Sequence, residues 1–277
     1  MTTTLTAPSR HAASTPARAE ATAAGPARTL RHAVALARRS LIKTWRTPEA
    51  LIDVTIQPII FVGMFVYLFG GAVSHSTHDY LQYVLPSIMV QTVLFSTVSI
   101  GVNLNTDIQK GVFDRFRSLP IARSAPLIGA VTADLIRYTV AIASTMLFGI
   151  IIGFRVQTDP FRALGALLLV ELFCLSLCWV SVFLGMIVRS PGAVQGIGFL
   201  ALFPLTFASS TFVPVDTLPG WLQAFVHVNP VTHLLAAVRG LMLGGEVAWP
   251  LTQSLLWSAG LLVVFFPLAL RAYRRRT

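Results

Sequence analysis

The chain is poor in charge, cysteine and catalytic motifs. Of its 277 residues only 12% are Asp, Glu, Lys or Arg, and two are cysteine. A phosphate-binding loop of the Gly-x-x-x-x-Gly-Lys-Ser/Thr type needs a lysine after its glycines, and neither Lys43 nor Lys110 is placed in that way. There is also no His-Glu-x-x-His pair and no Gly-x-Ser-x-Gly turn. We therefore assign no residue to catalysis, to a metal ion or to a cofactor.

Hydrophobic residues make up 55% of the sequence, and they are arranged in long runs. A bilayer core is roughly 30 Å thick, which a helix crosses in about twenty residues. Inside lipid the backbone must satisfy its own hydrogen bonds, so such runs become helices. We predict an all-α polytopic membrane protein whose single membrane domain covers 28–277. Six transmembrane helices are expected at about 51–69, 83–102, 127–154, 163–188, 193–213 and 251–270.

The net charge of +10 is unevenly distributed along the chain. All but four of the 21 Lys and Arg residues lie before the first span, after the second, after the fourth or after the sixth. If six spans alternate, these regions share one side. Positively charged loops are retained in the cytoplasm, so both termini should be cytoplasmic. The charge therefore indicates topology, and a nucleic-acid partner is not expected.

The segment before the first span divides into two parts. Residues 1–27 are rich in Ala, Thr, Ser and Pro and contain no apolar core of a signal peptide, which predicts a disordered cytoplasmic tail. Residues 28–46 place Leu30, Leu41 and Trp45 on one helical face, with arginines opposite. This pattern predicts an interfacial helix, and a frayed basic tail is the alternative.

The loop at 106–121 carries an unusual amphipathic pattern. Ile108, Phe116 and Leu119 fall on one helical ridge that is flanked by charges of both signs, and Pro120 ends the helix. A rigid ridge of this kind suits docking into a groove on another protein. The alternative is that its aromatic side chains enter the lipid interface.

The run from Gly111 to Ile121, GVFDRFRSLPI, resembles the cytoplasmic-loop motif of type-2 ABC exporter permeases, most closely the daunorubicin/doxorubicin-resistance branch. The order of parts is similar too. The resemblance implies that this segment couples the chain to a separate ATPase (nucleotide-binding) subunit, which would bind ATP and Mg. It also implies two permease copies, as a homodimer or with a paired homologous permease, and two ATPase subunits. The implied coupling residues are Gly111, Phe113, Asp114, Arg115, Phe116, Arg117, Leu119 and Pro120.

A short helix is predicted between the fifth and sixth spans. Asn229 and Pro230 form a helix start, and Gly244 is a natural stop. The resulting helix of about fourteen residues rises only ~21 Å, which is too short to cross a bilayer. Similar permeases carry short re-entrant outer helices here, preceded by a tryptophan such as Trp221. An interfacial aromatic anchor is the alternative for this loop.

Asp134, Arg137 and Glu171 lie well inside the predicted spans, where charges are costly, whereas Asp53 lies in the first turn of its span. Asp134 and Arg137 are three apart on one helix, which predicts a structural ion pair. Glu171 lies eight residues inside its span with no opposite charge near it in sequence. It could pair across helices, stay protonated or face an aqueous cavity, and it is our candidate for the substrate path.

The sequence thus predicts the permease subunit of an ATP-driven exporter in the bacterial cell membrane. It is not itself an enzyme, and its cargo would be amphipathic or hydrophobic compounds such as antibiotics. The rival interpretation is a proton-coupled secondary transporter that uses Glu171 and the pair Asp134 and Arg137. An intramembrane enzyme or assembly factor is disfavoured by the lack of a catalytic constellation.

Overall fold

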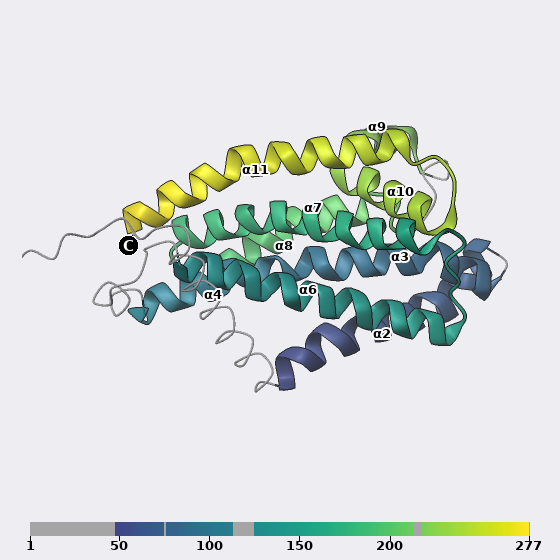
Figure 1. The fold of residues 1–277 in the computed structure, drawn as a ribbon, viewed down its shortest axis with the longest axis horizontal. Helices are drawn as coiled ribbons and strands as arrows, with labels where there is room; N and C mark the ends of the chain where they lie inside the picture. Colours follow the sequence, from purple (N-terminus) through teal and green to yellow (C-terminus); the bar gives the residue numbers. More distant parts are fainter. Residues whose placement is uncertain (1–47, 75, 113–124, 213–217, 277) are drawn as a thin grey trace, which may run out of the picture.

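The computed structural model describes residues 48–74, 76–112, 125–212 and 218–276, and over these residues every regular element is a helix. The predicted all-helical fold class is therefore confirmed for this part of the chain (Figure 1). The helices are α2 (Pro48–Ser74), α3 (Thr77–Ser96), α4 (Val98–Gln109), α6 (Ala125–Ile152), α7 (Pro160–Ile187), α8 (Pro191–Phe207), α9 (Gly220–Val228), α10 (Pro230–Leu243) and α11 (Ala248–Arg276).

Several predictions fall on other parts of the chain. The tail at 1–27, the interfacial helix at 28–46 and the coupling residues from Phe113 to Pro120 lie outside the described residues.

Within the described residues, four helical runs are long and apolar enough to cross a membrane. One of them joins α3 and α4 through Thr97, and it begins six residues before the predicted start at 83. The earlier start has a local cause, because the Ser76 hydroxyl accepts a hydrogen bond from the Asp79 N–H at 3.3 Å and caps α3. The four runs are Thr77–Gln109, Leu127–Ile152, Pro160–Ile187 and Ala248–Arg276.

The two remaining predicted spans correspond to shorter apolar stretches, Thr55–Gly71 within α2 and Pro191–Phe207 in α8. Helix α8 is shorter than the predicted fifth span at 193–213. Helix α8 ends at Phe207 because Ala208 leaves the helical conformation, with φ −90° and ψ 53°. Seventeen residues rise only ~26 Å.

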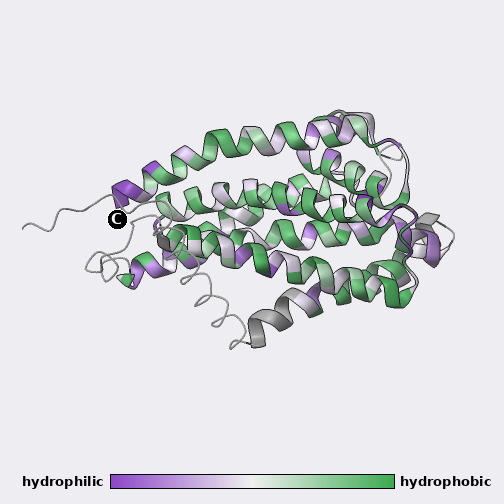
Figure 2. Ribbon diagram, in the orientation of Figure 1, coloured by the Kyte–Doolittle hydropathy of each residue, from purple (hydrophilic) through white to green (hydrophobic). Residues whose placement is uncertain are grey.

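Helix α7 occupies the middle of the bundle. It packs against α4, α10 and α11, while α2 packs on α3 and α6 (Figure 1). One buried apolar cluster joins α3, α6, α7 and α10, and it includes Val90, Tyr138, Phe173 and Leu234. Figure 2 shows hydrophobic residues along the outer faces of the long helices and hydrophilic ones near the C-terminal end of α11, as expected for a bundle surrounded by lipid.

Helix α10 has the bounds that the sequence indicated. The Asn229 side chain accepts a hydrogen bond from the Val231 N–H at 2.9 Å, Pro230 is the first helical residue, and Gly244 ends the helix at a φ of 90°. Most of its apolar side chains are buried against α3, α7 and α11. This short helix is therefore packed into one end of the bundle, which we call the α10 end. The opposite end, where α4 and α11 finish, is called the C-terminal end.

Candidate functional site

A cavity of about 410 Å³ lies where α2, α3, α4 and α8 face one another, with Arg137 of α6 at its edge. We call it the amide–aromatic cavity. Its polar lining consists of side chains from all four helices and includes the amides of Gln57, Gln91, Asn103 and Gln195.

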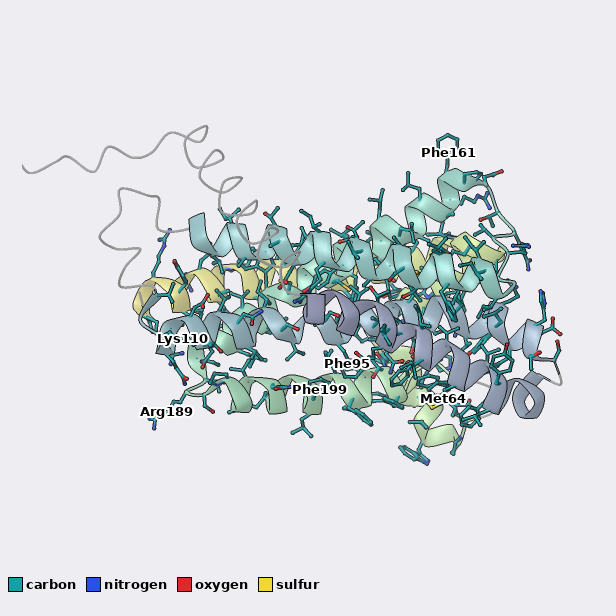
Figure 3. All side chains as sticks on the ribbon, turned by 90° about the horizontal axis from the view of Figure 1, so that it is seen from below. Met64, Phe95, Lys110, Phe161, Arg189 and Phe199 are labelled. Atoms are coloured by element: carbon teal, nitrogen blue, oxygen red, sulfur yellow. The ribbon has the colours of Figure 1, made fainter. Side chains whose placement is uncertain are left out.

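The aromatic part of the lining comes mainly from α8, which repeats phenylalanine at every fourth position, at Phe199, Phe203 and Phe207. The Phe95 and Phe199 rings stack at 5.2 Å between centroids, where α3 faces α8 (Figure 3). Towards the α10 end the Phe207 ring makes a tilted contact with Phe212, and the centroid of the Phe212 ring lies 4.4 Å from that of Phe65 on α2. Aromatic contacts therefore bridge α2 and α8 beside the cavity.

Asp134 and Arg137 are in direct contact. Arg137 Nη2 lies 3.0 Å from Asp134 Oδ1 and donates a hydrogen bond to the Ser96 carbonyl at 3.1 Å, and both side chains are largely buried. Sequence spacing indicated this pair. It could not indicate that Arg137 also lines the amide–aromatic cavity, because that depends on how α6 is rotated against α3 and α4.

Glu171 lies in a different place, a groove of about 390 Å³ between α6 and α7 that is lined mostly by leucines. The Thr139 hydroxyl donates to Glu171 Oε1 at 2.6 Å. Glu171 is not among the residues that line the amide–aromatic cavity. The role of Glu171 in a substrate path stays a prediction, and it requires that the path runs through this groove.

Arg239 is one of the four basic residues outside the regions that the charge pattern places on one side, and it lies within α10, largely covered. Its guanidinium donates to the carbonyls of Tyr83 (3.2 Å), Ser210 (2.7 Å) and Thr211 (3.2 Å), and to the hydroxyls of Ser87 and Ser210. It also lies 3.7 Å from the centroid of the Tyr83 ring. Among the described residues no carboxylate forms an ion pair with Arg239. We call this set of contacts the Arg239 clamp.

Asn229 adds to the clamp. Besides capping α10, its amide donates to the carbonyls of Leu205 (2.7 Å) and Ala208 (2.8 Å), which lie at the end of α8. Helix ends leave such carbonyls unpaired, so α10 supplies the donors that α8 lacks. Trp221, on α9, is 76% exposed and belongs to no such contact in the part of the chain that the structure describes.

At the C-terminal end, α4 stops where the predicted coupling segment begins. The Gly111 N–H donates to the Ile108 carbonyl at 3.1 Å, and Gly111 has a φ of 64°, a conformation that side chains disfavour. Lys110 and Arg189 lie at this same end (Figure 3). Within residues 48–74, 76–112, 125–212 and 218–276 there is no group of three or more His, Cys, Asp or Glu that could hold a metal ion.

Comparisons with known proteins agree with this architecture. The profile of the ABC-2 type transporter family matches residues 31–243. The chain is 44% identical to the daunorubicin resistance ABC transporter permease protein DrrB1 of Streptomyces coeruleorubidus, over 86% of this chain and 84% of that protein. It is 27% identical to a protein of Mycobacterium tuberculosis named as a probable doxorubicin resistance ABC transporter permease, DrrC, over 85% and 86% of the two chains.

Such relatives are permease subunits, which are not catalytic themselves. The family match, the multi-pass helical bundle and the amide–aromatic cavity lead to one assignment. The chain belongs to the ABC-2 type transporter family and is a membrane-spanning permease subunit.

Proposed function

We propose that this permease exports planar, partly polar aromatic compounds, with antibiotics of the anthracycline type as the first candidates. The observation that carries the proposal is the cavity whose lining combines amide and phenylalanine side chains. Binding sites of this size commonly combine apolar surface with a few polar groups that fix orientation. A polycyclic aromatic can stack on Phe95 and Phe199 while its oxygen substituents bond Gln91 and Gln195. The names of the relatives, daunorubicin and doxorubicin resistance permeases, support this cargo class.

The energy comes from a separate ATPase subunit that docks on the segment from Gly111 to Pro120. Support comes from α4, which ends at the C-terminal end of the bundle and which this segment follows in sequence. Arg189 and the basic last turn of α11, Arg274 to Arg276, lie at the same end. Basic residues gather on the cytoplasmic side of membrane proteins, where ATP is available. The ATPase partner, and not this chain, would bind ATP and Mg.

The membrane topology has six spans and both termini in the cytoplasm of a bacterial cell. Helices α2 and α8 join the four long runs as spans, and α8 reaches across with the help of the turn that follows it. The α10 end is then the outer end. Helices α9 and α10 form a re-entrant outer pair, which is supported by the burial of α10 between longer helices.

A second copy of the permease packs against α8. This helix buries one stripe, formed by Val194, Gly198, Leu202 and Thr206, and exposes most of its remaining residues. Gly192 and Gly196 lie four apart, and a Cβ atom added to either would meet no atom within 4 Å. Lipid-facing surfaces gain little from glycine, whereas helix–helix interfaces in membranes use small residues at this spacing. A dimer about α8 brings the two cavities near each other, and each copy carries one ATPase.

The proposal is tested by transport in vesicles. The permease and the ATPase encoded beside it are reconstituted together, and uptake of daunorubicin into inside-out vesicles is followed by fluorescence. We expect uptake that requires ATP and survives a protonophore. Phe199→Ala and Gln91→Leu should each lower uptake about tenfold, the value of one lost stacking or polar contact of ~1.4 kcal/mol.

Phe161→Ala is the matched control, because Phe161 projects from the start of α7 and is 86% exposed (Figure 3). Uptake by Phe161→Ala should equal that of the wild type. Uptake that stops with the protonophore and continues without ATP would instead identify a proton-coupled carrier. If ATP drives uptake but Phe199→Ala and Gln91→Leu transport normally, the cavity is not the cargo path.

A further inference from the structure

Helices α4 and α7 touch through their backbones near the C-terminal end. A Cβ atom added to Gly101 would lie 2.3 Å from the Ser181 carbonyl oxygen, and one added to Gly185 would lie 2.5 Å from the Gly101 oxygen. Two side chains at this crossing would normally separate the helix axes and take up small movements. With glycine on both helices, a shift of α4 meets the backbone of α7 directly.

One turn further along α4, the buried side chain of Asn105 is hydrogen-bonded to the end of α7. Its amide donates to the carbonyls of Gly185 (2.9 Å) and Val188 (2.7 Å). Gly185 lies in the last turn of α7 and Val188 is the residue that caps the helix, so no helical N–H follows to pair with their carbonyls. One turn further still, Gln109 donates to the Arg189 carbonyl at 2.8 Å. Gly101, Asn105 and Gln109 thus form a single face of α4 that contacts α7 and the turn directly after it.

Arg276 reaches the same carbonyls from α11. Its Nη1 donates to Val188 O at 3.0 Å and to Gly185 O at 3.3 Å, and also to Met186 O. Asn105 and Arg276 therefore perform the same capping of α7, but only Asn105 lies on the helix that continues into the proposed coupling segment.

We propose that Asn105 is the positioning residue that carries the ATPase movement from the end of α4 into α7. This inference rests on the proposed function, because it requires that the ATPase docks after Gly111. A push on that segment reaches Gln109 and Asn105 along the rigid axis of α4. It then passes to α7, which packs on α10 and α11 and so extends the displacement to the outer end. Without the Asn105 hydrogen bonds, α4 could slide along the end of α7, and the movement of the ATPase would not be passed on to α7.

An amide is well suited to this role. Two carbonyl oxygens need a donor at once, and one neutral NH₂ group supplies both hydrogen bonds without bringing a charge into the bundle. Asn105 Oδ1 is buried and has no hydrogen-bond partner among the described residues. Asn105→Asp would replace the donating NH₂ group by a carboxylate, which cannot donate to the Gly185 and Val188 oxygens, so both hydrogen bonds would be lost.

The experiment compares transport per ATP hydrolysed in the reconstituted permease–ATPase complex. The variants are Asn105→Ala, Asn105→Asp and Arg276→Met, with Thr106→Val as the matched control, since the Thr106 hydroxyl donates to Val102 O within its own helix. We expect both Asn105 variants to keep the ATPase bound through purification and to hydrolyse ATP, while transport per ATP falls about tenfold. Arg276→Met should lower the unfolding temperature and leave transport per ATP unchanged. Thr106→Val should change neither.

The outcomes separate the ways in which the inference can fail. If both Asn105 variants keep the wild-type transport per ATP, or if Arg276→Met lowers that ratio as much as they do, Asn105 is only a structural cap and the inference is wrong. Should Asn105→Ala fail to accumulate, Gln109→Ala at the exposed end of the same face must give a smaller loss of the same ratio, and a normal ratio there overturns the inference. If the wild-type chain neither retains an ATPase nor transports with ATP, the proposed function itself fails.

Discussion

The Arg239 clamp and the groove around Glu171 each hold an ionisable side chain away from water, yet their surroundings differ. Arg239 donates to oxygens on two other segments, α3 and the turn after α8. Glu171 accepts a side-chain hydrogen bond from Thr139 on the neighbouring helix, in a groove lined mostly by leucines. The sequence drew attention to Glu171 because of its depth in a span. Arg239 makes more hydrogen bonds to other segments than Glu171 does, so we expect it to contribute more to the stability of the fold. Depth within a span is therefore a poor guide to a residue's structural role.

The largest effect is expected from Arg239→Met. It keeps much of the side-chain volume but leaves the Thr211 and Ser210 carbonyls without their charged donor, which should cost about 3 kcal/mol of unfolding free energy. Thermal unfolding can be followed with a thiol-reactive fluorophore, because Cys174 and Cys178 are both buried and free. Arg162→Met, at an exposed arginine, is the control. Equal unfolding temperatures for the two variants would show that the Arg239 clamp stabilises the fold no more than an exposed arginine does.

Asn229→Ala comes next. It loses the cap of α10 and both bonds to the end of α8, and we expect a loss of about 2 kcal/mol in the same thiol assay. Asn229→Ser separates the two contributions, because serine can cap α10 but is too short to reach the Leu205 carbonyl. If Asn229→Ser is as stable as the wild type, the link between α10 and α8 contributes nothing.

Ser87→Ala should have a smaller effect. It removes one acceptor from Arg239 while the carbonyls of Tyr83, Ser210 and Thr211 stay in place, so about 1 kcal/mol is expected. Ser176→Ala is the matched control in the thiol assay, since the buried Ser176 hydroxyl donates to Leu172 O on its own helix. A larger loss for Ser176→Ala than for Ser87→Ala would contradict the view that Arg239 contacts dominate.

Glu171→Gln should have the smallest effect, within about 0.5 kcal/mol. The Thr139 hydroxyl can donate to the amide oxygen as it does to the carboxylate. If the cargo passes through the amide–aromatic cavity, which Glu171 does not line, ATP-driven transport should also be unchanged, and a daunorubicin uptake assay measures it. Loss of transport with normal folding would place Glu171 in the substrate path or in a proton relay. It would show that Glu171 is functionally important although it makes fewer contacts than Arg239.

Features fixed by neighbouring residues were predictable from the sequence. The bounds of α10 follow from Asn229, Pro230 and Gly244, and the contact between Asp134 and Arg137 follows from their spacing. Features that join distant segments were not. The end of α8 at Phe207 is stabilised by hydrogen-bond donors from Asn229 and Arg239, which lie more than twenty residues away. Such contacts cannot be predicted from the hydropathy of the sequence.

The sequence by itself determined that this chain is a helical membrane protein, because lipid forces each long apolar run to satisfy its backbone within one helix. Only the tertiary structure decided what the polar residues do. Gln91, Phe199 and Arg137 come to line one cavity, and Asn105 and Arg239 become donors to the ends of other helices, through the rotation and crossing of helices that no local pattern encodes. The physical reason is that a helix satisfies every backbone group except those at its ends, and those groups must find partners wherever packing brings them.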